Sequence, residues 1–348
     1  MFLIIQNNFM YKSKKSINIF LCIILFLFSS SILANSLEEG ISYYNNNKFD
    51  KAFPIIKNEA LKGNSEAQFF IAKMYELGEG TKLDLKKAVY WYSKGAKQGN
   101  PKAQNNLANL YADGKGVKKD LQKAIELYLQ SAKQGNSLAQ NNLGIMYRKG
   151  EGTKQDYSKS LYWNQRAAEH GDIYGIHAVG LAYHLGMGVP VDLNEAIKWY
   201  KKAAERGFTP SMWNLSTLYL PEDNPGDAKR WDEVYKWYAL GMQHGDRKNA
   251  PFGMGLIYMM GWGNTPKDYP KAAGLFTLAA ENGKEDGWYW LGVMEENGFG
   301  RPADKDRAFE LYRKAASLGS EAAIRRLNRE TSGTGMIQSV RELILPLQ

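Results

Sequence analysis

The stretch from Asn100 to Gly135, NPKAQNNLANLYADGKGVKKDLQKAIELYLQSAKQG, predicts two helices joined by a tight turn. Asn100 can cap a helix N-terminus, and Pro101 suits the first helical position because no backbone N–H is needed there. Apolar residues recur at helical spacing in both halves, and Asp120 can cap the second helix. Gly114 and Gly135 accept the left-handed backbone that ends a helix. Neither helix can bury its apolar stripe alone, so the hairpin needs neighbours of its own kind.

The same unit recurs along most of the chain, because its closing glycine returns at a nearly fixed period. These glycines are Gly63, Gly99, Gly135, Gly171, Gly207, Gly245, Gly283 and Gly319. Their spacing is 36 residues, except for two intervals of 38 residues that end at Gly245 and Gly283. A period of this length is typical of a solenoid built from repeated supersecondary units. We therefore predict an all-α fold of antiparallel helix hairpins stacked in sequence.

Aligned on these glycines, the copies share columns of similar residues. A small residue usually follows the glycine by four positions and an apolar residue by eight. A tyrosine follows by twelve in the first five copies, whereas Glu295 takes this place in the seventh. The second helices repeat pairs such as Trp199-Tyr200. These columns resemble the Sel-1-like repeat family, a relative of the tetratricopeptide repeats, and the copy from Ile176 to Gly207 is the most similar to its pattern. The resemblance implies a right-handed α/α superhelical solenoid that presents binding surfaces to other proteins and, in general, no catalysis.

The resemblance covers the chain from Asn64 to Gly319. We predict seven repeats, at 64–99, 100–135, 136–171, 172–207, 208–245, 246–283 and 284–319. Residues 35–63 should form a capping hairpin and residues 320–348 a capping helix with a tail, since a terminal repeat has one side facing water. The fifth repeat departs from the pattern, because Pro221 and Pro225 rule out a continuous helix at its turn.

Residues 1–34 have the pattern of an export signal. A basic segment with three lysines precedes an apolar run from Ile17 to Phe28, and small residues allow cleavage after Ala34. The apolar run is shorter than the ~20 residues that a membrane-spanning helix needs. We therefore expect a cleaved signal, with an uncleaved anchor as the alternative, and a mature chain without a membrane span in the periplasm or outside the cell. Either Met1 or Met10 can serve as the start.

Composition narrows the classes of function. Cys22 is the only cysteine and lies within the signal, so the mature chain can form no disulfide and no thiolate metal site. With 44% hydrophobic and 13% aromatic residues, the chain is of the globular kind. The formal net charge is +9, and loss of the three signal lysines leaves +6. Because this surplus is scattered over turns, without a basic helix that carries interleaved aromatics, we expect no nucleic-acid partner.

No pattern in the mature chain indicates catalysis, a metal or a cofactor. His177 and His184 would share one face of a helix, but about 10 Å apart at ~1.5 Å per residue. No carboxylate lies three or four residues from either histidine. The Ser-x-x-Lys, Gly-x-Ser-x-Gly and His-Glu-x-x-His patterns are absent. We therefore predict that the chain is not an enzyme, and one acting on peptidoglycan or β-lactams is the least favoured alternative.

The first helices carry variable residues at positions where a partner could bind. In related helical repeats this helix lines the concave side. The predicted binding residues are Asn105, Asn141, His177, Trp213, Phe252, Trp288 and Tyr289. Asparagine here, and glutamine one position earlier (Gln68, Gln104, Gln140), can donate to and accept from an extended peptide backbone. The aromatic residues can supply anchors of the kind that dominate binding energy. The alternatives are that these positions vary because nothing constrains them, or that some of the aromatics belong to the core.

The sequence thus predicts an exported, non-catalytic scaffold that binds a protein or peptide partner as a monomer. By resemblance, exported bacterial members imply a role in host contact or virulence. A periplasmic scaffold for envelope or exopolysaccharide assembly is the alternative. We expect the main binding site on the fourth to seventh repeats, where the row turns aromatic from Trp213 onward, with Asn105 and Asn141 as a secondary polar end.

Overall fold

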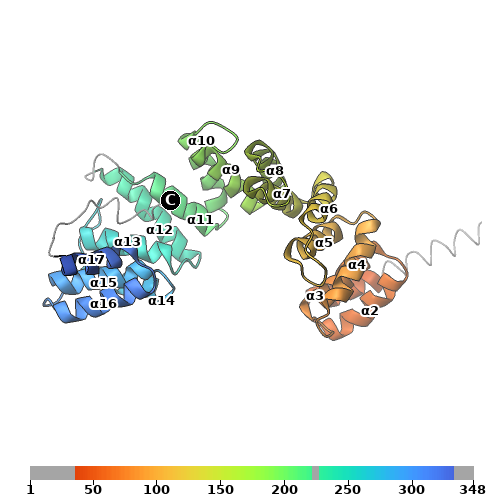
Figure 1. Cartoon of the computed structure of the whole chain (residues 1–348), viewed down its shortest axis with the longest axis horizontal. Coiled ribbons are helices and arrows are strands. Elements are labelled where there is room, and N and C mark those ends of the chain that lie inside the picture. The colour runs from red at the N-terminus through yellow and green to blue at the C-terminus, as the bar shows by residue number, and fades with distance from the viewer. Residues whose placement is uncertain (1–35, 222–226, 333–348) are drawn as a thin grey trace, which may run out of the picture. The chain divides into compact units, whose positions relative to one another are not determined.

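The computed structural model describes residues 36–221 and 227–332, and these ranges form helices and turns without a strand (Figure 1). The chain divides into two compact units, which meet in sequence between Asp172 and Ile173. The predicted export signal, the centre of the proline-containing turn of the fifth repeat and the C-terminal tail lie outside the described residues. Within the described residues, no helix combines the length and the apolar character that crossing a membrane requires.

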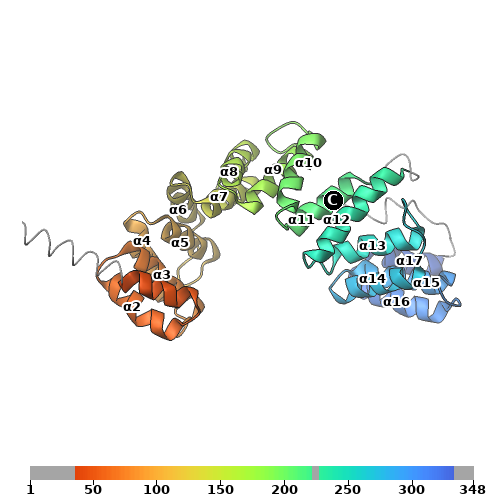
Figure 2. The same ribbon diagram turned by 180° about the vertical axis from the view of Figure 1, so that it is seen from behind.

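The first unit begins with a helix at 36–45 and continues with seven helices of equal length. They are α2 (Phe49–Leu61), α3 (Ser65–Leu77), α4 (Leu85–Lys97), α5 (Pro101–Asp113), α6 (Leu121–Lys133), α7 (Ser137–Lys149) and α8 (Tyr157–Glu169). Each helix packs against the next one in sequence, and α3 also contacts α5, the first helix of the following repeat. Figure 2 shows these hairpins from behind. The prediction of an all-α fold built from consecutive helix hairpins is confirmed.

The helix ends of this unit follow from the residues that border them. Asn100 accepts a hydrogen bond from the Ala103 N–H, and Asp120 accepts one from the Lys123 N–H, so both predicted N-caps are confirmed. Gly114 ends α5 in the left-handed conformation, with φ 72°. Gly116, the second glycine of the turn, has φ 70°, and a Cβ there would lie 2.6 Å from the Leu85 carbonyl oxygen of the preceding repeat. The turn therefore needs glycine both for its backbone angle and for its close packing.

The second unit continues the hairpin pattern with less regular helices. They are α9 (Ile173–Leu185), α10 (Leu193–Ala204), α11 (Thr209–Leu218), α12 (Ala228–Gln243), α13 (Asn249–Met260), α14 (Tyr269–Glu281), α15 (Glu285–Asn297), α16 (Lys305–Ser317) and α17 (Glu321–Ser332). The fifth hairpin pairs the shortest of these helices, α11, with the longest, α12. Pro251 lies in the first turn of α13, where a missing N–H costs no helical hydrogen bond. The last helix, α17, packs against α15 and α16 and closes the row.

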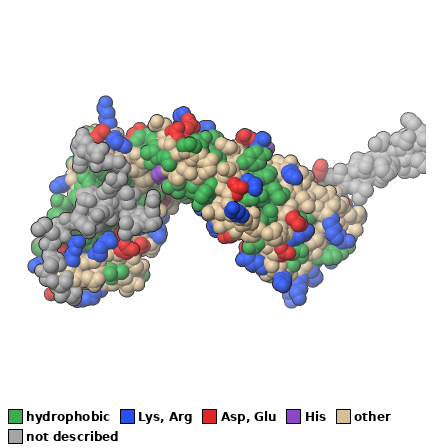
Figure 3. Space-filling view, turned by 45° about the horizontal axis from the view of Figure 1, so that its top comes forward, with side chains coloured by type: hydrophobic (Ala, Val, Ile, Leu, Met, Phe, Trp, Pro, Cys, Tyr) green, Lys and Arg blue, Asp and Glu red, His purple; other side chains and the backbone are tan. Residues whose placement is uncertain are grey.

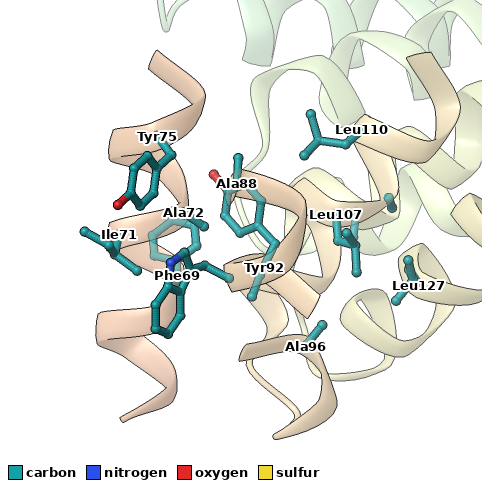
Figure 4. Packing of buried hydrophobic residues seen from close by; sticks show 14 of the residues in the cluster. Phe69, Ile71, Ala72, Tyr75, Ala88, Tyr92, Ala96, Leu107, Leu110 and Leu127 are labelled. Atoms are coloured by element: carbon teal, nitrogen blue, oxygen red, sulfur yellow. The ribbon is translucent and has the colours of Figure 1, made fainter. Parts of the chain in front are cut away.

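The core consists of side chains that neighbouring hairpins share, as Figure 4 shows for α3, α4 and α5. Ile71 and Tyr92 are fully buried there, with Leu107 and Leu110 beside them. An aromatic residue corresponding to Tyr92 is buried in most repeats, and the third repeat has Asn164 instead. Glu295 replaces the tyrosine that the first five repeats have twelve positions after the glycine, and its buried charge is neutralised by ion pairs. Its carboxylate is 1% exposed and pairs with two arginines, Arg301 and Arg307.

Candidate protein-binding surface

Three glutamines of the first helices lie inside the first unit, although we expected their amides to pair with a peptide. Gln68, Gln104 and Gln140 are only 3–4% exposed. Each donates from Nε2 to a carbonyl oxygen of the preceding helix, at 3.2 Å for Ala60 and Ala96 and 3.0 Å for Ala132. Each Oε1 is paired with a side chain at the end of the following helix, namely Gln98, Gln134 and His170. The expectation is therefore wrong for the glutamines, because both ends of each amide already join neighbouring helices.

The two predicted asparagines of the first unit differ in exposure. Asn105 is 3% exposed, and its amide is bound at both ends. Its Nδ2 donates to Asn106 Oδ1 at 3.0 Å, and its Oδ1 accepts from Asn142 Nδ2 at 3.2 Å. Asn141 is half-buried, and its side chain has no hydrogen bond to another described residue. A buried amide with both ends engaged cannot contact a partner, so the prediction is wrong for Asn105.

A chain of side-chain hydrogen bonds extends from Asn105 toward α3. Asn106 Nδ2 donates to the Tyr92 hydroxyl at 2.9 Å, and this hydroxyl donates to Glu76 Oε2 at 2.7 Å. Burial and the charge of Glu76 raise the pKa of Tyr92, so its hydroxyl keeps its proton at neutral pH. The chain thus ends at a carboxylate on the first helix of the preceding repeat.

The same chain extends from Asn105 toward α7. Asn142 Nδ2, which donates to Asn105, also lies 3.3 Å from Asn109 Oδ1. Asn109 Oδ1 accepts from the Tyr128 hydroxyl at 2.5 Å as well. Burial raises the pKa of Tyr128, so this hydroxyl also stays protonated. Asn106, Asn109 and Asn142 are half-buried, and we call these three residues the amide strip.

Sequence reasoning missed the amide strip by one position along the helix. Asn106 and Asn142 follow the predicted residues Asn105 and Asn141 directly, and Asn109 lies one helical turn beyond Asn106. The spacing of three between Asn106 and Asn109 was a usable signal, because residues three apart share one face of a helix. It indicates a polar stripe on α5 beside the apolar one.

His177 is the predicted residue of the fourth repeat and lies in the second unit. Its Nδ1 lies 2.8 Å from the Ser211 hydroxyl, and its ring packs 5.4 Å from the Tyr200 ring and 5.1 Å from the Phe208 ring. Burial lowers the pKa of His177 to about 4, so the imidazole is neutral at physiological pH. His177 is half-buried, so it offers only part of its ring to a partner, and the rest packs against its neighbours.

Sequence reasoning did not single out an exposed aromatic group that lies next to His177. Tyr174, on α9, is 55% exposed and packs edge-on against Phe208, with ring centroids 5.2 Å apart. Phe208 in turn packs against His177. We call Tyr174, His177 and Phe208 the aromatic cluster. Its signal in the sequence was the helical spacing of three between Tyr174 and His177.

Of the next two predicted anchors, one lies at the surface and one in the core. Trp213 is half-buried, with its ring 5.8 Å from that of Tyr238. Phe252 is completely buried and packs 6.0 Å from Phe276. The prediction is therefore wrong for Phe252. The physical reason is that α13 is apolar and buried on almost every side, so it has no face to offer to a partner.

Trp288 and Tyr289, the last two predicted residues, are both half-buried. The Lys314 ammonium lies 3.3 Å from the centre of the Trp288 ring, a cation–π contact. The Tyr289 ring packs 5.5 Å from that of Tyr312, and burial raises the pKa of Tyr289. Trp288 and Tyr289 therefore keep part of their surface available, but each is also held by the seventh repeat itself.

Charged side chains of both signs are mixed on the face of the molecule that Figure 3 shows. Figure 3 shows Lys and Arg side chains spread over the visible face, with Asp and Glu among them. In residues 36–221 and 227–332, no group of three or more His, Cys, Asp or Glu side chains is placed to hold a metal ion. The described part of the chain thus offers amide and aromatic groups on its first helices.

Comparison with models of protein families identifies the repeats. The Sel1 repeat model matches residues 65–100, 101–136, 137–172, 173–208, 249–284 and 289–320. The chain belongs to the Sel1 repeat family. The family model leaves out residues 209–248, which hold the fifth hairpin with its short α11 and long α12, and also the first residues of α15 at 285–288. No curated protein sequence matches this Sel1 repeat chain significantly.

Many solved structures are similar to this Sel1 repeat chain, and two of them have TM-scores above 0.6. A Sel1 repeat protein from Oxalobacter formigenes is 32% identical with a TM-score of 0.63, over 71% of this chain and 99% of that one. A protective antigen present in uropathogenic Escherichia coli strains, which displays an SLR fold, is 27% identical with a TM-score of 0.73. The match covers 87% of this chain but 65% of the antigen, so this chain spans about two thirds of its length. A repeat scaffold of this kind fits a role in protein interaction.

Proposed function

We propose that this Sel1 repeat chain is an exported, non-catalytic scaffold that binds another protein through its first helices. The observation that carries the proposal is the aromatic cluster. Tyr174 keeps 55% of its surface exposed while its ring is braced by Phe208. A braced, exposed aromatic ring loses little conformational freedom on binding, which is why such residues dominate binding energy at interfaces. Trp213, Trp288 and Tyr289, which are half-buried on later first helices of the second unit, are further proposed contacts.

The proposed place of action is outside the cytoplasm, in host contact or virulence. Export rests on the signal pattern of residues 1–34. The role in host contact is supported by the similarity to the protective antigen of uropathogenic strains. The proposed partner is a protein or a peptide, and the scaffold acts as a monomer.

Site-specific photo-crosslinking in the native host tests the interaction. A benzophenone side chain replaces Tyr174 in one variant and Trp288 in another. The matched control replaces Tyr90, which is 53% exposed on the second helix α4. We expect a covalent adduct with one protein from Tyr174 or Trp288 and none from Tyr90, detected as a mass shift on gels. An adduct from Tyr90 alone, or from no position, would contradict the proposal.

Intact mass of the same purified protein tests export. We expect a protein that begins near Asn35, recovered from the periplasm or the medium. A full-length mass in the membrane fraction would favour an uncleaved anchor and contradict the proposed localisation. The crosslinking result would still decide whether the chain binds a partner.

A further inference from the structure

The hydrogen-bond chain of the first unit has a fixed direction, because an ionised carboxylate can only accept. Glu76 therefore accepts a hydrogen bond from the Tyr92 hydroxyl, and the Tyr92 oxygen accepts one from Asn106 Nδ2. Asn106 then presents Oδ1 to Asn105 Nδ2, and Asn105 presents Oδ1 to Asn142. A flip of any one amide would set two oxygens, or two N–H groups, against each other.

The same direction decides which atoms of the amide strip stay free. Asn142 uses Nδ2 on Asn105 and Asn109, so its Oδ1 has no partner within the described ranges. Asn109 uses Oδ1 on Asn142 and Tyr128, so its Nδ2 has none there either. Neither free atom belongs to the polar atoms that are buried without a partner, so each keeps some surface in contact with solvent. Two side chains that touch thus present one acceptor and one donor.

These free atoms are held in position before any ligand arrives. Each amide is half-buried and is already tied through its other end to two neighbouring side chains. A preorganised group loses less conformational freedom on binding than a mobile one. The strip is also uncharged. A carboxylate or sulfate anion could satisfy Asn109 Nδ2, but it offers no donor to Asn142 Oδ1.

We propose that Asn109 and Asn142 bind the main chain of an extended peptide segment of the partner protein. An extended residue turns its own N–H and C=O to the same side, as in the antiparallel pairs that exchange two hydrogen bonds. Its C=O accepts from Asn109 Nδ2, and its N–H donates to Asn142 Oδ1. Recognition depends on the main chain, so it is tolerant of side-chain sequence. This proposal rests on the proposed scaffold function and names the chemistry of the partner.

The experiment uses the full chain and random dodecapeptides displayed on phage as the probe. One selected peptide is then synthesised unmodified, with single N-methyl groups along the main chain, and with single alanine substitutions. The test variant is Asn109→Asp, which keeps an acceptor for Tyr128 and Asn142 but removes the free N–H groups. The control is Asn214→Asp. Asn214 is a half-buried asparagine on the first helix of the fifth hairpin, in the column of Asn106, and it bonds Tyr200 as Asn106 bonds Tyr92.

We expect Asn109→Asp to weaken peptide binding about tenfold or more, and Asn214→Asp to change it less than about twofold, measured by fluorescence anisotropy. N-methylation at one or two positions should weaken binding about as much, while each alanine substitution costs less than about threefold. Circular dichroism of Asn109→Asp at 25 °C confirms that the variant is folded.

Three results would overturn the proposal. The first is selection of no peptide, and the second is unchanged affinity in Asn109→Asp. The third is binding of cellotetraose, lost in Asn109→Asp, without any peptide, which would assign the strip to carbohydrate. If peptides bind but depend on Trp213 and not on Asn109, the strip proposal fails while the scaffold function stands. If the crosslinking also yields no partner, both fail.

Discussion

Asn109 and Asn142 contact each other, yet a carboxylate at one position should act differently from a carboxylate at the other. Asn109→Asp keeps an oxygen where Tyr128 and Asn142 donate. Asn142→Asp places an oxygen against the carbonyl oxygens of Asn105 and Asn109 and breaks both bonds. We expect Asn142→Asp to lower the free energy of unfolding by about 1–3 kcal/mol, and Asn109→Asp by less than about 1 kcal/mol, in urea denaturation at pH 7.

Repeating the urea denaturation at acidic pH provides the control for this comparison. A protonated carboxyl group can donate again. The oxygens around position 142 should raise the pKa of the introduced carboxyl group above its ordinary value of about 3.9, so the deficit of Asn142→Asp should shrink as the pH falls from neutral toward 3.9. Equal stability of the two variants at pH 7 would mean that the direction of the hydrogen-bond chain is not fixed by Glu76.

His177 gives a pH dependence at the same scale. Burial lowers its pKa to about 4, against about 6.5 in an unfolded chain. Between these values the unfolded state binds more protons, so stability is fully present above pH 6.5 and is lost as the pH falls toward 4. We expect the melting temperature of the wild type to fall through this window more steeply than that of His177→Asn. The exposed His244→Asn is the control, and a wild-type slope retained in His177→Asn would refute the assignment.

At the scale of elements, the turn of a regular repeat depends on a glycine that packs against the repeat before it. Gly116 has φ 70°, and a Cβ there would lie 2.6 Å from the Leu85 carbonyl oxygen. A left-handed backbone alone costs an L-residue about 1–2 kcal/mol, and the contact adds to it. We expect Gly116→Ala to lower the free energy of unfolding by about 2 kcal/mol or more, measured by chemical denaturation.

Gly274 supplies the matched control for this prediction. It lies inside α14, and a Cβ there would meet nothing within 4 Å. Because alanine is favoured over glycine inside a helix by up to about 1 kcal/mol, Gly274→Ala should be neutral or stabilising. A similar loss of unfolding free energy in both variants would mean that the contact between the turn and the neighbouring repeat does not stabilise the fold.

The sequence was a good guide to these elements and a poorer one to the surface between them. Asn100 and Asp120 cap the helices where their chemistry predicts, because a cap depends on residues three positions away. The burial of Gln104 depends on the Ala96 carbonyl of another helix, which no residue type reveals. Phe252 is core because α13 is enclosed by its neighbours, a property of packing that the repeat period does not contain.

At the scale of the whole molecule, the two units differ in how their cores are organised. The first has one continuous core cluster, which runs from Leu37 to Met146. The second has two, one around Tyr200 and Met212 and the other from Trp231 to Met294. The division of the second core falls at the fifth hairpin, the one that the family model does not match. Within the second unit, the irregular hairpin thus coincides with the division of the core.

This organisation predicts that residues 36–172 fold on their own. In a repeat protein each hairpin depends mainly on its neighbours, so a cut between hairpins removes few of the contacts that hold the rest. We expect a strongly helical circular dichroism spectrum and one cooperative thermal transition from this fragment. A fragment that ends at Gln155 is the control, because it lacks α8 and leaves the first helix of that hairpin, α7, without its partner. Its melting temperature should be lower by about 5 °C or more. Unfolding of the 36–172 fragment at 25 °C would mean that its core needs the second unit, and that the repeats do not fold as a series of local contacts.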